Sequence, residues 1–193
     1  MSEIQDIFKV PVYKTLLDID NTKLENYAMS QYRKSKGRYI SNVGGWQSDE
    51  YFESDNIKPI NELISSIQKE LPLFTDHLDI RAQNKVDNIW ININGYRDYN
   101  NSHIHSNSLI SGVYYVKTHK DCGVIRFNHP CFNLYDTIWN NVNKKAYNNY
   151  NSPTWWLPST EGVLYLFPSW LEHLVTPNFH KTKKRISISF NVI

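Results

Sequence analysis

The stretch EGVLYLFPSWLEH, which runs from Glu161 to His173, carries the strongest structural signal in the chain. Residues 162–167 are almost entirely apolar, and the run has the length of one buried β-strand. Pro168 ends the predicted strand, because proline cannot donate a hydrogen bond to a neighbouring strand. The segment therefore predicts a buried strand that presents a histidine, His173, a few residues beyond its end.

The stretch RISISF at residues 185–190 alternates polar and apolar side chains. In a β-strand this period of two places Arg185, Ser187 and Ser189 on one face and the apolar residues on the other. A polar face on a central strand is costly unless it meets a ligand or a partner. An arginine on such a face can form two hydrogen bonds with one carboxylate. We therefore expect a ligand-facing strand with Arg185 at its start.

The rest of the chain shows further strands and two helices. The same period of two predicts a strand over residues 86–94, with Trp90, Asn92 and Asn94 on one face. Helical spacing predicts one helix that starts near residues 21–24 and a second over residues 57–71, which Pro72 should end. The remaining predicted strands cover residues 7–17 (an edge strand), 109–117, 124–128, 162–167 and 185–192.

This order of elements indicates the fold class. Two helices precede many short strands, and strands do not alternate with helices as they do around a parallel sheet. We therefore expect a mainly β protein, an antiparallel sandwich or barrel buttressed by N-terminal helices. A length of 193 residues suits one domain.

Residues 130–158 fit the strand pattern least well. The segment holds three tryptophans among many asparagines and tyrosines. Loops of this length in compact domains are usually lids or binding loops, so we interpret it as an insertion over one mouth of the barrel. An aromatic flap that only packs against the core is the alternative.

Composition narrows the class of partner. The formal net charge is +2, and the one short basic run is at residues 181–185, whereas nucleic-acid binders usually show a broader basic face. The N-terminus lacks the pattern of a signal peptide, and there is no long apolar run. Two cysteines are too few for a disulfide framework. We expect a cytoplasmic protein with no nucleic-acid or membrane partner; a homodimer stays open.

His103 and His105 are two residues apart, so an extended backbone points both imidazoles to the same side. A β-scaffold can offer two ligands to one metal ion in this way. Taken alone, the pair is more typical of two solvated loop histidines than of a metal site. The distal His173 and the strand that starts at Arg185 favour the metal-site interpretation.

Several motifs, in this order, resemble the core of the Fe(II)/2-oxoglutarate-dependent dioxygenases. Residues 162–168, His173, Pro177 and Arg185-x-Ser187 resemble its C-terminal half, and His103-x-His105 with residues 111–116 and 123–127 resembles its N-terminal half. More narrowly, the stretches at residues 8–11, 44–48 and 111–116 are similar to an uncharacterised group of such oxygenases from bacteria and phages. The resemblance covers most of the chain and leaves the insertion at residues 130–158 unmatched.

The resemblance implies a double-stranded β-helix, the cupin-like jelly roll, in a single oxygenase domain of residues 1–193. An N-terminal strand and helical buttress would occupy about residues 1–80, and the core about residues 81–193. It also implies Fe(II), 2-oxoglutarate and O2, with hydroxylation of a small-molecule or peptide substrate that the sequence does not identify. The sequence shows no Ser-His-Asp arrangement, no Cys-His arrangement and no phosphate-binding glycine loop.

The resemblance also implies roles for individual residues. His103 would be the first iron ligand and His173 the distal one. Arg185 would bind the distal carboxylate of 2-oxoglutarate. The residues that would assist Arg185 are Ser187 or Ser189, Tyr115, which matches a tyrosine position of prolyl-hydroxylase-like relatives, and Asn94 or Asn92 on the preceding strand.

The chain departs from the family pattern at residue 105. The usual ligands are His-x-Asp or His-x-Glu and a distal histidine. In this chain His105 stands at the position where the family pattern has the carboxylate. A neutral imidazole still binds Fe(II), but the site keeps one more positive charge. Glu172 should point away from His173 on an extended strand, whereas Asp98 stays open as a ligand. We predict His103, His105 and His173 as the metal ligands.

Two other functions compete with the oxygenase. One is a three-histidine metal enzyme of the cupin type that does not use 2-oxoglutarate, in which case Arg185 would only form a structural ion pair. The other is a catalytically silent β-helix that serves as a binding protein and whose histidines hold no metal. The fold alone cannot separate these functions.

Overall fold

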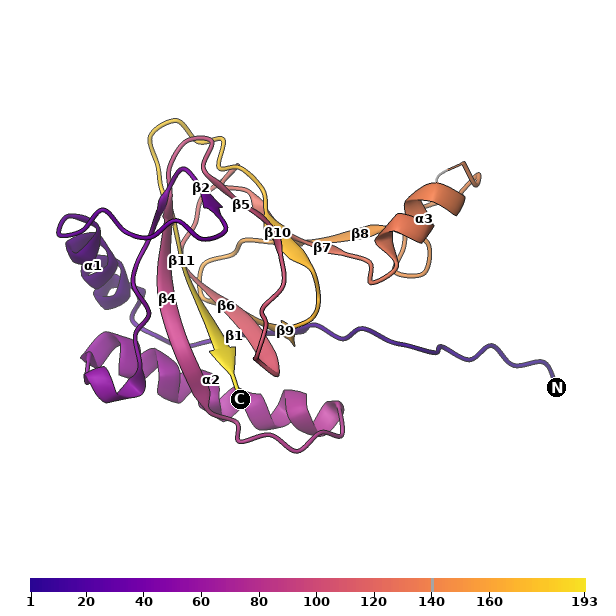
Figure 1. The fold of residues 1–193 in the computed structure, drawn as a ribbon, viewed down its shortest axis with the longest axis horizontal. Helices are drawn as coiled ribbons and strands as arrows, with labels where there is room; N and C mark the ends of the chain where they lie inside the picture. The colour runs from indigo at the N-terminus through magenta and orange to yellow at the C-terminus, as the bar shows by residue number, and fades with distance from the viewer. Residues whose placement is uncertain (140) are drawn as a thin grey trace.

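The computed structural model describes residues 1–139 and 141–193. Over these residues the chain forms two antiparallel sheets, one with the strand order β1-β9-β6-β11-β4-β3 and one with the order β2-β5-β10-β7-β8. The sheets face each other as the layers of a jelly roll, with helices packed outside the larger one (Figure 1). The strands of the larger sheet are β1 (Tyr13–Leu16), β3 (Trp46–Gln47), β4 (Val86–Asn94), β6 (Ile110–Lys117), β9 (Val163–Pro168) and β11 (Arg185–Val192).

The smaller sheet holds strands that the sequence patterns mostly missed. Its members are β2 (Asn42–Val43), β5 (Tyr99–His103), β7 (Val124–Asn128), β8 (Thr154–Pro158) and β10 (His173–Val175). Only β7 was predicted, because the others are short or carry mainly polar residues and so lack a clear period of two. Strands β4, β6, β9 and β11 of the larger sheet lie close to their predicted ranges, whereas β1 covers only residues 13–16 of the predicted 7–17.

The larger sheet has one apolar face and one polar face. The face that carries Ile89, Ile91 and Ile93 packs with α1 (Asn21–Tyr32) and α2 (Lys58–His77) into the main core. The opposite face carries Asn92 and Ser187 and turns toward the smaller sheet, where it lines a cavity. The predicted alternation along β4 and β11 is confirmed, and it directs their polar side chains between the two sheets.

Helix α2 continues past Pro72, so the prediction that Pro72 ends this helix is wrong. A proline inside a helix costs about 3 kcal/mol, because it removes one hydrogen bond and crowds the preceding turn. The extension carries Phe74 and Thr75, which are buried, and the Thr75 hydroxyl donates to the carbonyl of Leu71 at 3.2 Å. Full burial of a phenylalanine contributes about 1.5–3 kcal/mol, so tertiary packing offsets most of the penalty.

The segment at residues 130–158 forms an arm. It contains α3 (Phe132–Ile138) and ends in β8, which pairs with β7 as the edge strand of the smaller sheet. In Figure 1 the arm projects sideways from the body. Among the residues that the structure describes, none of this segment lines the cavity that holds His103, His105 and His173. The structure therefore does not support a lid over that cavity.

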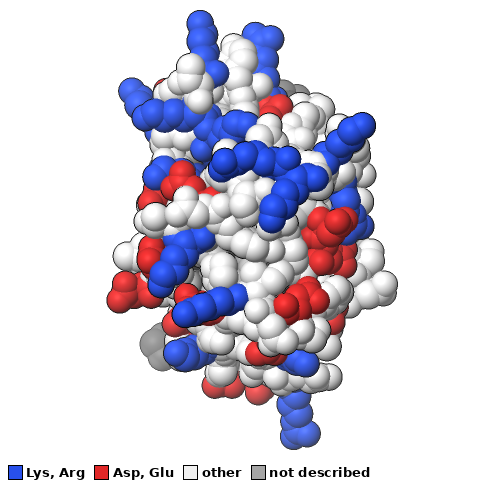
Figure 2. Space-filling view, turned by 90° about the vertical axis from the view of Figure 1, so that its left-hand side faces the viewer, with Lys and Arg blue, Asp and Glu red and all other residues white. Residues whose placement is uncertain are grey.

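Basic side chains gather on one part of the surface. Figure 2 shows Lys and Arg concentrated in the upper part of the face that carries the helices, with acids and bases mixed below. The Lys184 ammonium lies 4.0 Å from the centre of the Tyr32 ring, so the basic run at residues 181–184 adjoins the end of α1. Cations that are distant in the sequence are therefore close together in the fold.

Two negative findings apply to the described part of the chain. No helix there is long and apolar enough to cross a membrane. Cys122 is buried and Cys131 is exposed, and both are free thiols.

Candidate metal centre

Three histidines meet at one end of the β5–β10 pair in the smaller sheet. His103 ends β5 and His173 begins β10, and the two residues are direct cross-strand partners. His105 lies just beyond β5, and its backbone N–H donates to the carbonyl of Ser169 at 3.0 Å. The expectation that His103 and His105 share one extended strand segment is wrong for His105, because His103 ends β5 and His105 follows it in a loop. The bond to Ser169 nevertheless holds this loop beside β10.

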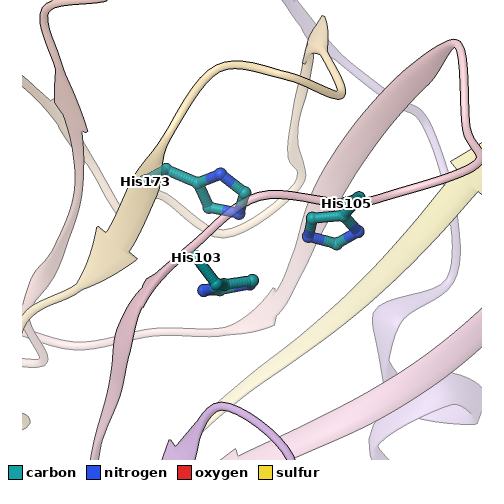
Figure 3. Close-up of side chains that lie close together, drawn as sticks. All are labelled: His103, His105 and His173. Atoms are coloured by element: carbon teal, nitrogen blue, oxygen red, sulfur yellow. The ribbon is translucent and has the colours of Figure 1, made fainter.

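The three imidazoles face a common space (Figure 3). Their ring centres are 4.4 Å apart for His103 and His173, 5.1 Å for His103 and His105, and 5.2 Å for His105 and His173. One nitrogen from each ring lies within 4.8 Å of the other two. Within residues 1–139 and 141–193, no other group of three His, Cys, Asp or Glu side chains is this close.

Each ring is held by a hydrogen bond from its Nδ1 atom. His103 Nδ1 donates to the Asn101 carbonyl at 2.7 Å, and His173 Nδ1 donates to the Leu171 carbonyl at 2.9 Å. His105 Nδ1 donates to the Asn191 side-chain oxygen at 2.7 Å. With the proton on Nδ1, the lone pair of a neutral imidazole is on Nε2. All three rings are therefore set to bind a metal through Nε2, and the His105 Nε2 atom is buried without a partner.

Burial keeps these histidines neutral. It lowers the pKa of His103, lowers that of His105 to about 4 and lowers that of His173 to about 3. The neighbouring His103 further lowers the pKa of both other rings. A histidine must be deprotonated to bind a metal. The cluster is therefore ready for a cation at neutral pH.

Arg185 is a buried cation with free donors. Its side chain is completely buried, and its Nη1 atom donates to the carbonyls of Cys122 and Thr176. Its Nε and Nη2 atoms have no hydrogen-bond partner, and no carboxylate within the described residues pairs with it. Burial lowers the pKa of Arg185, but a guanidinium stays charged in proteins. An uncompensated buried charge with two unused donors fits an anionic ligand.

A cavity of about 250 Å³ joins the histidines to the polar face of the larger sheet. Besides the three histidines, its lining includes four of the predicted cofactor-binding residues, namely Tyr115, Asn92, Ser187 and Ser189. Arg185 and Asn94 are cross-strand partners one pair further along the same face, and neither lines the cavity itself. The fold therefore brings the predicted residues to one face of the sheet, but Arg185 and Asn94 lie next to the cavity and do not line it.

The polar wall contains groups without partners. The Tyr115 hydroxyl and the side-chain oxygens of Asn92 and Asn94 are buried without a hydrogen bond. Burial raises the pKa of Tyr115 to about 12, so this hydroxyl keeps its proton and can donate it in a hydrogen bond. The side-chain nitrogen of Asn92 donates to the Ser189 hydroxyl at 3.1 Å. Tyr115 and Arg185 together offer donors to an anion.

The two acidic residues considered from the sequence as metal ligands, Asp98 and Glu172, have other partners. Asp98 accepts a hydrogen bond from the Gly95 amide at 2.6 Å, and Glu172 accepts one from the Ser102 hydroxyl at 2.7 Å. Neither carboxylate belongs to the cluster of metal-binding groups. His105 is therefore the third member of the cluster in this structure.

Three features of the site were not predicted from the sequence. Trp90 stacks on His105, with ring centres 5.7 Å apart. Asn191 holds the same histidine, and it continues the alternation of Arg185, Ser187 and Ser189, a signal that was present in the sequence. At the cavity mouth, Arg38 and Glu50 form an ion pair at 3.1 Å. The two residues are 12 positions apart in the sequence, and no local sequence pattern predicts that they meet.

The fold and the site define a class: a jelly-roll protein with a cluster of three histidines, suited to hold a metal ion, between its sheets. Residues 88–191 match the family described as "Putative 2OG-Fe(II) oxygenase". The match covers more than half of the chain, so the chain belongs to this family of 2-oxoglutarate/Fe(II) oxygenases.

Solved structures share the fold at low sequence identity. A Pseudomonas putida prolyl-4-hydroxylase has a TM-score of 0.66 at 10% identity, covering 95% of this chain and 94% of that chain. A Trichoplax adhaerens prolyl hydroxylase in complex with a hypoxia-inducible-factor peptide has a TM-score of 0.58 at 15% identity, covering 94% and 83%. The epimerase SnoN, in complex with Fe3+ and alpha-ketoglutarate, has a TM-score of 0.63 at 9% identity, covering 94% and 78%. No curated protein sequence matched the chain.

The residues present fit both groups that the family name implies. Three neutral imidazoles that engage Nδ1 in a hydrogen bond and keep the Nε2 lone pair for a metal are suitable ligands for Fe(II). The unused donors of Arg185 suit a carboxylate, which 2-oxoglutarate carries at both ends. The similar structures include prolyl hydroxylases and an epimerase, so the shared fold does not specify the reaction.

Proposed function

We propose that this chain couples the oxidative decarboxylation of 2-oxoglutarate to the hydroxylation of a C–H bond in a small-molecule or peptide substrate. When bound, Fe(II) supplies the redox chemistry that converts the C–H bond, 2-oxoglutarate and O2 into an alcohol, succinate and CO2. The supporting observation is the arrangement of His103, His105 and His173, whose Nδ1 protons are all engaged and whose Nε2 atoms are directed inward.

In this proposal His103, His105 and His173 hold the iron. Three protein ligands leave coordination positions for 2-oxoglutarate and O2. Because all three ligands are neutral, the protein donates no negative charge to the metal, unlike a set that includes a carboxylate. The bound 2-oxoglutarate then supplies the anionic ligand, which should make its binding and the binding of the metal strongly interdependent.

Arg185 would hold the distal carboxylate of 2-oxoglutarate through Nε and Nη2, the two donors that have no partner. Tyr115, whose hydroxyl is also unpartnered, would donate to the same carboxylate. Ser187 and Ser189 lie on the same strand face as Arg185 and would complete the polar wall, together with Asn92 and Asn94. Arg185 does not line the cavity, so co-substrate binding requires a side chain in the wall to move.

Turnover of 2-oxoglutarate tests the proposal. Purified protein is incubated with Fe(II), ascorbate, 2-oxoglutarate and a panel of peptides and amino acids, and succinate is measured by mass spectrometry. We expect succinate formation that depends on Fe(II) and O2 and that is lost in His173→Ala. His77→Ala is the matched control, because His77 is an exposed histidine at the end of α2, away from the cavity.

The outcome also discriminates among the competing functions. Iron binding without 2-oxoglutarate binding would favour a three-histidine metal enzyme that does not use 2-oxoglutarate. Absence of metal binding in the wild-type protein would favour a catalytically silent β-helix and would overturn the proposal.

A further inference from the structure

The three histidines differ in how their rings are held. His103 and His173 each donate to a backbone carbonyl two residues earlier in the chain, so the local backbone fixes their orientation. His105 donates instead to the side chain of Asn191 on β11, 86 residues away. His105 is therefore the one ring of the three whose tautomer depends on a side chain that a mutation can remove.

Asn191 is itself held in place. Its side-chain oxygen also accepts a hydrogen bond from the Ser111 hydroxyl at 2.9 Å, and Ser111 is completely buried on the neighbouring strand β6. One amide oxygen thus receives two donors from different elements. This arrangement directs the acceptor end of the amide toward His105.

The tautomer of His105 matters because its Nε2 atom has no partner. If the proton were on Nε2, a buried N–H group would be left without an acceptor, which is unfavourable. With the proton on Nδ1, the same atom presents a lone pair to the cluster. The Asn191 oxygen requires the proton on Nδ1, because a carbonyl oxygen can only accept.

We propose that Asn191 is a positioning residue of the metal centre, which fixes His105 in the tautomer and orientation that can bind the metal through Nε2. The inference rests on the proposed function, since it concerns the same site. Residues that orient a metal ligand typically contribute about 10- to 100-fold to metal affinity.

The first test uses metal-free protein labelled with 15N at histidine. Long-range 1H–15N correlation spectra distinguish the two neutral tautomers of each ring. We expect His105 to carry its proton on Nδ1 in the wild type and in Asn191→Asp, whose carboxylate is also an acceptor. In Asn191→Leu, which has the same branched shape and no acceptor, we expect His105 to shift toward the Nε2–H tautomer, while His103 and His173 stay unchanged.

The second test measures the affinity for Mn(II) by calorimetry in the same variants. Asn191→Leu should bind about 10- to 100-fold more weakly than the wild type, and Asn191→Asp should restore affinity to the wild-type level or above it. Asn88→Leu is the matched control and should bind like the wild type. Asn88 is the cross-strand partner of Asn191 and lines the same cavity, but it donates to Glu50 and not to a histidine.

Two results would overturn the inference: an Nε2–H tautomer of His105 in the metal-free wild type, or equal affinities in Asn191→Leu and Asn88→Leu. The tautomer spectra do not depend on a metal, so they test the role of Asn191 even if the wild type binds no Mn(II). A wild-type protein that binds no Mn(II) would contradict the proposed function, and the tautomer spectra would still show whether Asn191 orients His105. If Asn191→Leu fails to fold, the fold-preserving Asn191→Asp must still show the Nδ1–H tautomer.

Discussion

At position 105 the chain carries an imidazole where the pattern it resembles has a carboxylate. The structure places this ring within the cluster and turns the nearby carboxylates of Asp98 and Glu172 to other partners. The grouping of His103, His105 and His173 was predicted from the two-residue spacing of the first pair and from the family resemblance, although His105 lies in the loop after β5 and not in a strand. The hydrogen bonds that set their tautomers could not be predicted, because two of them depend on the local backbone conformation and one on a residue 86 positions away.

A pair of substitutions at His105 tests its role. His105→Ala should weaken Fe(II) binding by more than the roughly 10- to 100-fold that follows the loss of a supporting residue. His105→Asp should retain Fe(II), because a carboxylate at this position restores the common two-histidine, one-carboxylate set. Anaerobic calorimetry measures both affinities. An affinity of His105→Ala equal to that of the control His77→Ala would show that His105 only flanks the site.

Arg185 should be needed for 2-oxoglutarate binding. Arg185→Lys keeps the charge but loses the planar pair of donors, so we expect the affinity for 2-oxoglutarate to fall about 10- to 100-fold, equivalent to 1.5–3 kcal/mol. Calorimetry on the Mn(II)-loaded protein measures this, and thermal unfolding checks that the variant is folded. Arg38→Lys at the cavity mouth is the control and should leave the affinity unchanged. Equal affinities in both variants would make Arg185 a structural residue.

At the scale of elements, packing decides where the sequence rules hold. Strands β4 and β11 were predicted well because one face of each packs into the core with α1 and α2 and so imposes a regular alternation. Helix α2 passes through Pro72 because the residues beyond it add to the same core. Strands β5 and β10 were missed because they are short and serve to present His103 and His173 rather than to fill the core.

Two leucines on α2 test this account of the helix. Leu71 is completely buried, whereas Leu73, two residues further on, is 61% exposed. Leu71→Ala should lower the free energy of unfolding by about 2–5 kcal/mol, because it leaves a cavity in the core. Leu73→Ala should change it by less than about 0.5 kcal/mol. Urea denaturation followed by circular dichroism measures both values, and a similar loss in the two variants would contradict the assigned orientation of the helix.

At the scale of the whole molecule, both sheets contribute residues to the candidate metal centre, and no single strand supplies all of them. The smaller sheet and the loop after β5 supply the histidines, and the larger sheet supplies Arg185 and the polar wall. The jelly roll was expected from the order of elements and from the resemblance, and it is confirmed. The sideways direction of the arm at residues 130–158 was not predictable, because its aromatic side chains suit a lid and a projecting arm equally well.

Metal binding should stabilise the whole fold, because the site exists only when both strands of the β5–β10 pair are in place. A ligand at 100 times its dissociation constant adds about 2.7 kcal/mol to the free energy of unfolding, which corresponds to about 5–10 °C in Tm for a chain of this length. Differential scanning fluorimetry with Mn(II) should show this increase in the wild type and in His77→Ala. The shift should be absent in His173→Ala; a shift of the same size there would place the metal elsewhere.

The most direct test of the central claim is a crystal structure of the protein soaked with Mn(II) and N-oxalylglycine, a stable analogue of 2-oxoglutarate. We expect one anomalous peak, bound to the Nε2 atoms of His103, His105 and His173, and an N-oxalylglycine molecule whose distal carboxylate contacts Arg185. An anomalous peak away from these three atoms, or a His105 ring turned away from the metal, would contradict the account.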